Sequence, residues 1–207
     1  MSIEQAYNNW ANQYDTNKNV TRDLDKKSTV DTLSKYDFET VIELGCGTGK
    51  NTLWLMEKAK TIIGLDFSQA MLNKAKEKIA CNKVTFKKAD LTQNWAIEND
   101  FADLITSSLT LEHIKDLNHI FRQTQLKLKD NGLFFISELH PFKQYLGSKA
   151  KFVTTNGTQE LETYTHNITD YIEEAKNNNL KLIEIKEWFD DDIDKRLPRL
   201  ISFVFKK

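Results

Sequence analysis

Three glycines and an acid around one apolar stretch could hold a nucleotide-like ligand. Val41 to Leu44 is apolar except for Glu43, and Gly45, Gly47 and Gly49 follow before an apolar helical pattern begins. This order predicts a strand, a glycine-rich turn and a helix. Glycine permits positive φ there, so a ligand can approach backbone N–H groups at a helix N-terminus, where the helix dipole favours negative charge. The stretch predicts a site for a partly anionic group, although similar turns also simply connect strand to helix.

Two further acids stand where the next predicted strands end. Asp66 ends an apolar strand about twenty residues after the first glycine, where a carboxylate of a βαβ unit can accept both ribose hydroxyl groups. Asp90 follows the strand predicted for Val84 to Lys88. The glycine spacing is G-x-G-x-G, whereas the dinucleotide motif G-x-G-x-x-G would need its last glycine at Lys50. These features favour an adenosine-containing cofactor that is not a dinucleotide.

The combined pattern resembles class I S-adenosylmethionine-dependent methyltransferases of the small-molecule type, similar to ubiquinone- and menaquinone-biosynthesis-like methyltransferases. The matching positions are the E-x-G-x-G-x-G run from Glu43 to Gly49, the ribose acid Asp66 and the adenine-side acid Asp90. The resemblance covers roughly Asp37 to Lys207 and implies S-adenosyl-L-methionine as the cofactor. It implies methyl transfer to a small-molecule acceptor. The residues predicted to bind the cofactor are Tyr14, Glu43, Gly45, Cys46, Gly47, Gly49, Asp66, Phe67, Met71, Asp90, Leu91 and Ser107.

The first 36 residues are predicted to form an N-terminal helical cap. Apolar and aromatic residues recur at spacings of three and four from Ser2 to Asp15, and a second helix is expected from Asp23 to Tyr36 with Leu24, Val30 and Leu33 inward. The first helical stripe could simply pack against the body of the fold. In the methyltransferases that the chain resembles, such a helix ends in a Tyr-Asp pair, here Tyr14-Asp15, that closes over the cofactor.

The remaining elements predict an α/β fold. We expect a Rossmann-like, seven-stranded, mostly parallel sheet with a reversed last strand and helices on both faces, forming a single methyltransferase domain over residues 1–207. Ser68 is expected to cap a helix. The later strands are predicted at Phe101–Ser107, Leu133–Leu139, Leu180–Phe189 and Leu200–Phe205, and the later helices at Gln69–Ala80, Asp116–Lys129 and Tyr171–Asn177.

Residues 141–165 are too many for a simple link in a compact domain, and such connections are usually functional. Within them, Asn156-Gly157 is flanked by Thr-rich extended residues, which is a strong signal for a β-hairpin. The sequence therefore predicts a lid insertion after the fifth strand.

Four residues are candidates for proton transfer on the acceptor side, because the loops that carry them are expected near the reactive methyl group. His113 lies in an L-E-H-I segment that resembles the family, His140 follows the fifth strand, and Tyr164 and His166 end the lid. A neutral imidazole can take a proton from an attacking hydroxyl or amine at neutral pH. Local packing is the alternative for His113, and capping of a strand end or a helix start is the alternative for His140 and His166.

Composition limits the partners. The 29 basic and 30 acidic residues nearly cancel, so no overall field attracts nucleic acid or an anionic membrane. Neither a signal peptide nor an 18-residue apolar run is seen, and two cysteines suit a reducing cytoplasm. No H-E-x-x-H or Cys-rich pattern supports a metal site. We expect a cytoplasmic monomer or homodimer acting on a small molecule; a nicotinamide-dependent oxidoreductase and a non-catalytic binding module remain the alternatives.

Overall fold

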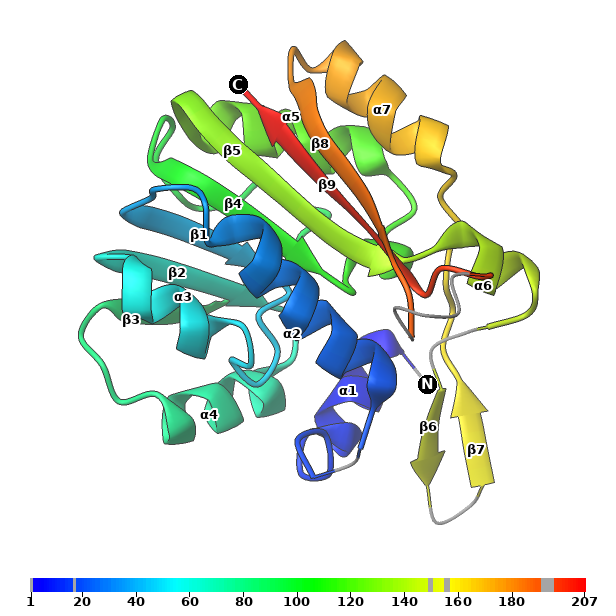
Figure 1. Ribbon diagram of the computed structural model, residues 1–207. Helices are drawn as coiled ribbons and strands as arrows, with labels where there is room; N and C mark the ends of the chain where they lie inside the picture. Colours follow the sequence, from blue (N-terminus) through cyan, green and yellow to red (C-terminus); the bar gives the residue numbers. More distant parts are fainter. Residues whose placement is uncertain (1, 17, 149–150, 155–156, 191–195) are drawn as a thin grey trace.

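The computed structural model describes residues 2–16, 18–148, 151–154, 157–190 and 196–207, arranged as a sheet with helices around it (Figure 1). The helices are α1 (Ile3–Trp10), α2 (Val20–Leu33), α3 (Thr52–Lys58), α4 (Gln69–Lys78), α5 (Leu117–Lys127), α6 (Pro141–Tyr145) and α7 (Ile168–Asn177), with a 3₁₀ turn η1 (Leu111–His113). The strands are β1 (Thr40–Leu44), β2 (Thr61–Asp66), β3 (Val84–Lys88), β4 (Ala102–Ser108), β5 (Leu128–Leu139), β6 (Lys151–Thr154), β7 (Gly157–Glu160), β8 (Lys181–Trp188) and β9 (Leu200–Lys206).

The main sheet has seven strands in the order β3-β2-β1-β4-β5-β9-β8. Strands β1 to β5 pair in parallel, whereas β9 is antiparallel to both β5 and β8. The predicted Rossmann-like sheet with a reversed last strand is therefore confirmed. Because parallel strands end at one edge, the segments that follow β1 to β5 meet there, which is where ligands bind in open α/β sheets.

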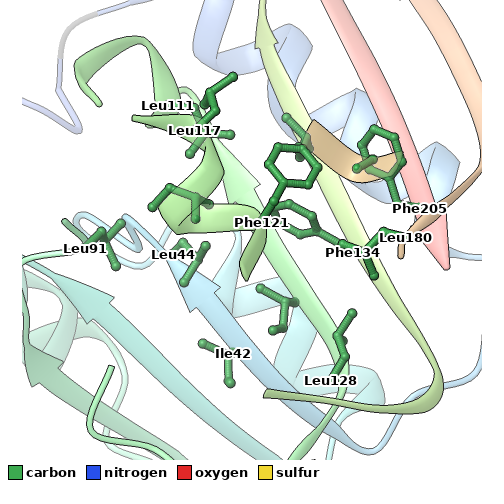
Figure 2. Close-up of a cluster of buried hydrophobic side chains, with 14 of the residues drawn as sticks. Ile42, Leu44, Leu91, Leu111, Leu117, Phe121, Leu128, Phe134, Leu180 and Phe205 are labelled. Carbon is green, nitrogen blue, oxygen red and sulfur yellow. The ribbon is translucent and has the colours of Figure 1, made fainter. Parts of the chain in front are cut away.

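Alternate side chains of the strands bury both faces of the sheet. On one face, α5 and α7 cover a cluster that includes Phe121, Phe134 and Phe205, with neighbouring ring centroids 5.4 to 6.4 Å apart (Figure 2). On the other face, α2 and α3 cover a cluster with Leu33, Val41 and Leu55. Burial on both faces explains why these strands are almost continuously apolar rather than alternating. The result is a rigid base for the loops at the sheet edge.

The cap differs from its prediction in which residues it buries. Helix α1 ends at Trp10 rather than Asp15, and α2 covers Val20–Leu33 rather than Asp23–Tyr36. Leu33 is buried as expected, but Leu24 and Val30 are only half-buried. Instead, α2 buries a polar face made of Arg22, Asp25, Ser28, Thr29 and Thr32. The apolar pattern gave the wrong inward face for this helix. The side of α2 that faces the sheet lies beside polar groups, and Ser28 Oγ lies 2.8 Å from Ser137 Oγ on β5.

The lid insertion contains a short helix and a hairpin. Helix α6 follows β5 directly and was not predicted, whereas β6 and β7 pair antiparallel and confirm the predicted hairpin. Asn156 of the turn signal lies outside the described residues. Within the described part of the chain, none of the helices combines the length and apolarity needed to cross a membrane.

Candidate functional site

A cavity of about 510 Å³ opens at the carboxyl ends of the parallel strands. Its walls come from the turn after β1, the loops after β2, β3 and β4, helix α1, and the segment that returns from the lid. Nine predicted site residues line it: Tyr14, Gly45, Gly47, Asp66, Phe67, Met71, Asp90, Leu91 and His113. The structure thus brings together most of the residues predicted to bind the cofactor, from segments far apart in the sequence.

The glycine turn and Asp66 hold each other in place. Gly45 and Gly47 have φ of +64° and +52°, and the Gly47 N–H donates to Asp66 Oδ2 at 2.9 Å. Asp66 Oδ1 accepts from the Ser68 N–H at 2.8 Å. Burial raises the pKa of Asp66 to about 6, while these N–H donors favour its charged form. At neutral pH a fixed carboxylate therefore borders the cavity, as ribose recognition requires.

The walls near Asp66 suit an adenosine group. Phe67 and Met71 supply apolar surface, and Leu91 adds more from the loop after β3. Asp90 is exposed and orients its carboxylate by accepting from the Thr92 N–H at 2.9 Å. A methyl group added at Gly47 would meet nothing within 4 Å, so open space lies directly above the turn. These residues fit the predicted S-adenosylmethionine.

A second, smaller cavity of about 50 Å³ lies beside the glycine turn. Its lining includes two predicted residues, Glu43 and Cys46, together with Tyr14 and two residues of α2, Arg22 and Asp25. Glu43 is buried and accepts from Thr52 Oγ1 at 2.5 Å, and burial raises its pKa to about 8. Glu43 therefore braces the turn against α3 from behind.

Two predicted cofactor residues line neither cavity. Gly49 has φ of +79°, and a Cβ there would lie 2.9 Å from Ile79 Cδ1, so this glycine is needed for packing against the end of α4. Ser107 is fully buried within β4, which ends at Ser108, one residue later than predicted. Since side chains alternate along a strand, Ser108 and not Ser107 reaches both cavities.

His113 is the predicted proton acceptor that the structure places in the large cavity. Its Nδ1 lies 3.2 Å from the Glu162 carbonyl oxygen, which can only accept, so Nδ1 carries the proton. Its Nε2 lies 2.9 Å from the hydroxyl of Tyr7 on α1, and burial raises the pKa of Tyr7 well above its usual value. The Tyr7 hydroxyl therefore donates to a neutral His113.

The other three acceptor-side candidates line neither cavity, and the expected gathering of three histidines around one opening is not found among the described residues. His140 is buried, accepts from the Phe142 N–H and lies 3.2 Å from Glu187 Oε1. His166 donates to the Ile114 carbonyl at 2.8 Å. Tyr164 is half-exposed and holds Glu112 through its backbone N–H. Catalytic roles for these three residues stay predictions.

Several lining residues had not been predicted, notably Tyr7, Arg22, Asp25 and Thr110. The sequence contained a signal for the two on α2, because Arg22, Asp25, Thr29 and Thr32 recur at spacings of three and four. Tyr7 formed part of the predicted apolar stripe of the first helix, and only the fold shows that its hydroxyl reaches His113.

Below the cavity, Glu138 at the end of β5 fixes the loop after β4. Its Oε1 accepts from the Thr110 and Leu111 N–H groups at 2.9 and 2.8 Å, and its Oε2 has no hydrogen-bond partner among the described residues. Burial, assisted by the charge of Glu112, raises the pKa of Glu138 to about 8. The folded protein thus keeps a proton here at neutral pH.

This proton gives a pH-dependent stability. The unfolded chain releases it near 4.5 and the folded protein near 8, so the folded state binds more protons in between and loses stability as pH rises through this window. We expect the melting temperature of the unliganded protein to fall from about pH 5 to about pH 8, and Glu138→Gln to flatten this fall. Thermal denaturation followed by circular dichroism measures both. Identical slopes would show that Glu138 does not keep its proton.

A Rossmann-like sheet that carries such a turn and such carboxylates has the architecture of class I S-adenosylmethionine-dependent methyltransferases. Residues 42–136 match the family described as a methyltransferase domain. A solved S-adenosylmethionine-dependent methyltransferase of Listeria monocytogenes is 23% identical with a TM-score of 0.77, covering 90% of this chain and 99% of that one. S-adenosylmethionine is the cofactor of the class.

Curated relatives include two O-methyltransferases. The malonyl-[acyl-carrier protein] O-methyltransferase of Bacillus cytotoxicus is 28% identical over 141 residues, covering 65% of this chain and 48% of that protein. The ubiquinone biosynthesis O-methyltransferase of Bartonella tribocorum is 28% identical over 109 residues, covering 52% of this chain and 44% of that protein. The matched part thus spans about half the length of these relatives.

Proposed function

We propose that the protein transfers the methyl group of S-adenosylmethionine to a small-molecule acceptor. The observation that carries the proposal is the cavity in which Asp66, the glycine turn and the Tyr7–His113 pair meet. Its volume of about 510 Å³ suits a cofactor with a small acceptor group. The methyltransferase domain and the O-methyltransferase relatives support this function over a nicotinamide-dependent oxidoreductase or a binding module.

The cofactor supplies an activated methyl group, and the chain supplies position and a proton acceptor. Asp66, Asp90 and the glycine turn bind and orient the cofactor, so catalysis rests mainly on proximity and alignment. His113 Nε2 receives the proton of an attacking hydroxyl or amine, directly or through the Tyr7 hydroxyl, which passes its own proton to Nε2. Burial lowers the pKa of His113, which keeps it neutral at pH 7. Glu112 Oε1 lies 4.0 Å from Nε2, and burial raises the pKa of Glu112 to about 7; in its ionised form this carboxylate stabilises the imidazolium that forms.

We also propose how the chain is organised around this reaction. Residues 1–207 act as one domain, residues 1–36 cap the cofactor and residues 141–165 form a lid over the acceptor. Supporting contacts are the cap residues Tyr7 and Tyr14 in the cavity wall and the Tyr164 N–H that binds the Glu112 carbonyl at 2.7 Å. Cys46 and Cys81 are free thiols, which supports a cytoplasmic location.

Titration calorimetry with S-adenosylhomocysteine and with NAD tests the proposed function. We expect S-adenosylhomocysteine to bind and NAD not to bind; NAD binding alone would reject the proposal. Screening small-molecule extracts with labelled S-adenosylmethionine then identifies the acceptor.

Asp66→Ala should weaken S-adenosylhomocysteine binding about 5- to 150-fold, because it removes carboxylate contacts worth roughly 1 to 3 kcal/mol. Calorimetry measures the change, with Asp37→Ala, an exposed acid away from both cavities, as the control. Equal affinities for Asp66→Ala and the unaltered protein would remove Asp66 from the site.

A further inference from the structure

We infer that the methyl acceptor is an amine, which binds as an ammonium beside Glu112 and is methylated on its nitrogen. The inference rests on the proposed function and names the chemical class of its acceptor. It follows from the charge of the larger cavity, from the aromatic rings in its wall and from the buried acid next to His113.

The first support is the charge of the larger cavity. The described residues that line it include four acids, Glu4, Asp66, Asp90 and Glu162, and one lysine, Lys88. The Lys88 ammonium already binds Glu4 Oε1 at 2.8 Å. S-adenosylmethionine brings a single net positive charge, so the lining stays negative around the acceptor. A carboxylate or phosphate acceptor would meet no unneutralised cation among the described lining residues, whereas an ammonium is attracted.

The second support is the aromatic wall of the same cavity. Tyr7, Phe67 and His113 all line it, and the centroid of the Tyr7 ring lies 5.6 Å from that of Phe67 and 5.5 Å from that of His113. The faces of tyrosine and phenylalanine rings attract cations, most strongly where water is excluded. An alkylammonium therefore suits this wall, and an anion does not.

The third support is the position of Glu112. This residue is only 9% exposed, and its Oε1 lies 4.0 Å from His113 Nε2. The lid segment holds it in place, since Gln144 Nε2 donates to its Oε2 at 3.3 Å and the Tyr164 N–H donates to its carbonyl oxygen at 2.7 Å. A nearby ammonium favours the charged form of a buried carboxyl group. Glu112 thus places negative charge next to the nitrogen that receives the acceptor's proton.

These acids favour nitrogen over oxygen as the reacting atom. The bound ammonium gives one proton to His113 Nε2, directly or through the Tyr7 hydroxyl. Its freed lone pair then forms the new N–C bond, while the C–S bond of the cofactor breaks and leaves its electron pair on sulfur. The positive charge passes from sulfur to a nitrogen close to the His113–Glu112 pair. A hydroxyl acceptor that lost its proton would instead create negative charge beside the same acids, which like-charge repulsion opposes.

The labelled product that the unaltered full chain forms in the extract screen tests the inference before the acceptor is identified. Boiling hydriodic acid releases O-methyl groups as methyl iodide and leaves N-methyl groups intact. The label should therefore stay with the product, and the product should bind a cation exchanger at neutral pH. Release of labelled methyl iodide, or label that passes the exchanger, overturns the inference while the proposed function stands. No labelled product from any extract would reject both.

Variants of Glu112 then test the acid itself. Glu112→Gln should lower kcat/KM for the acceptor at least about tenfold and leave the affinity for S-adenosylhomocysteine within about twofold, since contacts with charged groups contribute strongly. Glu112→Asp keeps the charge and should recover most of the loss. Glu98→Gln, at an exposed position outside both cavities, is the matched control and should change neither value. Full activity of Glu112→Gln, or equal losses in Glu112→Gln and Glu112→Asp, overturns the inference. If Glu112→Gln does not fold, the chemistry of the product decides alone.

Discussion

Replacing His113 by Ala should lower turnover by about 10² to 10⁴-fold, the contribution typical of a positioned general base. His113 lines the cavity, Glu162 fixes its tautomer, and Tyr7 connects its Nε2 to the cap. The affinity for S-adenosylhomocysteine should change less than about threefold, because the adenosine contacts lie on other loops. Steady-state kinetics with the acceptor identified by the screen, together with calorimetry, measure the two effects.

The pH profile separates a base from a packing residue. Burial places the pKa of His113 below its usual 6.5, so kcat/KM of the unaltered enzyme should be level at neutral pH and fall only in the acid range. His113→Ala should lose that acid limb as well as rate. His119→Gln serves as the control, since this histidine lies on α5 outside both cavities.

The same kinetics tests the remaining acceptor-side predictions. His140→Gln and His166→Gln test the predicted catalytic roles: a histidine that takes the proton of the acceptor should cost at least about tenfold in turnover, whereas a histidine that only packs outside both cavities should cost less than about threefold. A loss in either variant as large as that of His113→Ala would show that the histidine replaced in that variant takes part in proton transfer.

The fold was predictable wherever the pattern of apolar residues was compatible with only one kind of secondary structure. Long apolar strands separated by amphipathic helices allow few topologies, since parallel strands need crossovers and those crossovers are right-handed. Asp66 and Asp90 were predictable for the same reason, because the carboxyl ends of parallel strands all lie at one edge of the sheet. The glycine turn contributed its own conformational signal at Gly45 and Gly47.

The features that the sequence did not predict depend on side-chain partners from distant segments. Ser108 rather than Ser107 lines the cavities, because successive side chains of β4 point to opposite faces of the sheet. His140 lies outside the cavity, because Glu187 on β8 and the Phe142 N–H bind its two ring nitrogens. The polar face of α2 runs against the expectation that buried residues are apolar, because it packs beside polar groups such as Ser137 on β5.

Gly45→Ala should be among the most destabilising single substitutions in the chain. Gly45 has φ of +64°, where a Cβ costs about 1 to 2 kcal/mol. That Cβ would also lie 2.1 Å from Thr110 Oγ1 and 2.7 Å from Thr110 Cγ2. Thr110 cannot easily retreat, because Glu138 Oε1 accepts from its N–H and its Oγ1 donates to the Ser108 carbonyl at 3.0 Å. Overpacking of this kind adds about 1 to 3 kcal/mol.

The combined effect should lower the melting temperature by roughly 5 to 20 °C, since 1 kcal/mol corresponds to about 2 to 4 °C in a chain of this size. Gly147→Ala is the matched control, because Gly147 has φ of +87° but a Cβ there meets nothing within 4 Å, so its cost is that of the backbone alone. Adding Thr110→Ala to Gly45→Ala removes the contacts with Oγ1 and Cγ2 but keeps the one with Thr110 Cβ at 2.9 Å, so it should recover part of the loss. Equal melting temperatures for Gly45→Ala and Gly147→Ala would show that the loop after β4 yields freely, and Glu138 could then not be what holds Thr110 over the glycine turn.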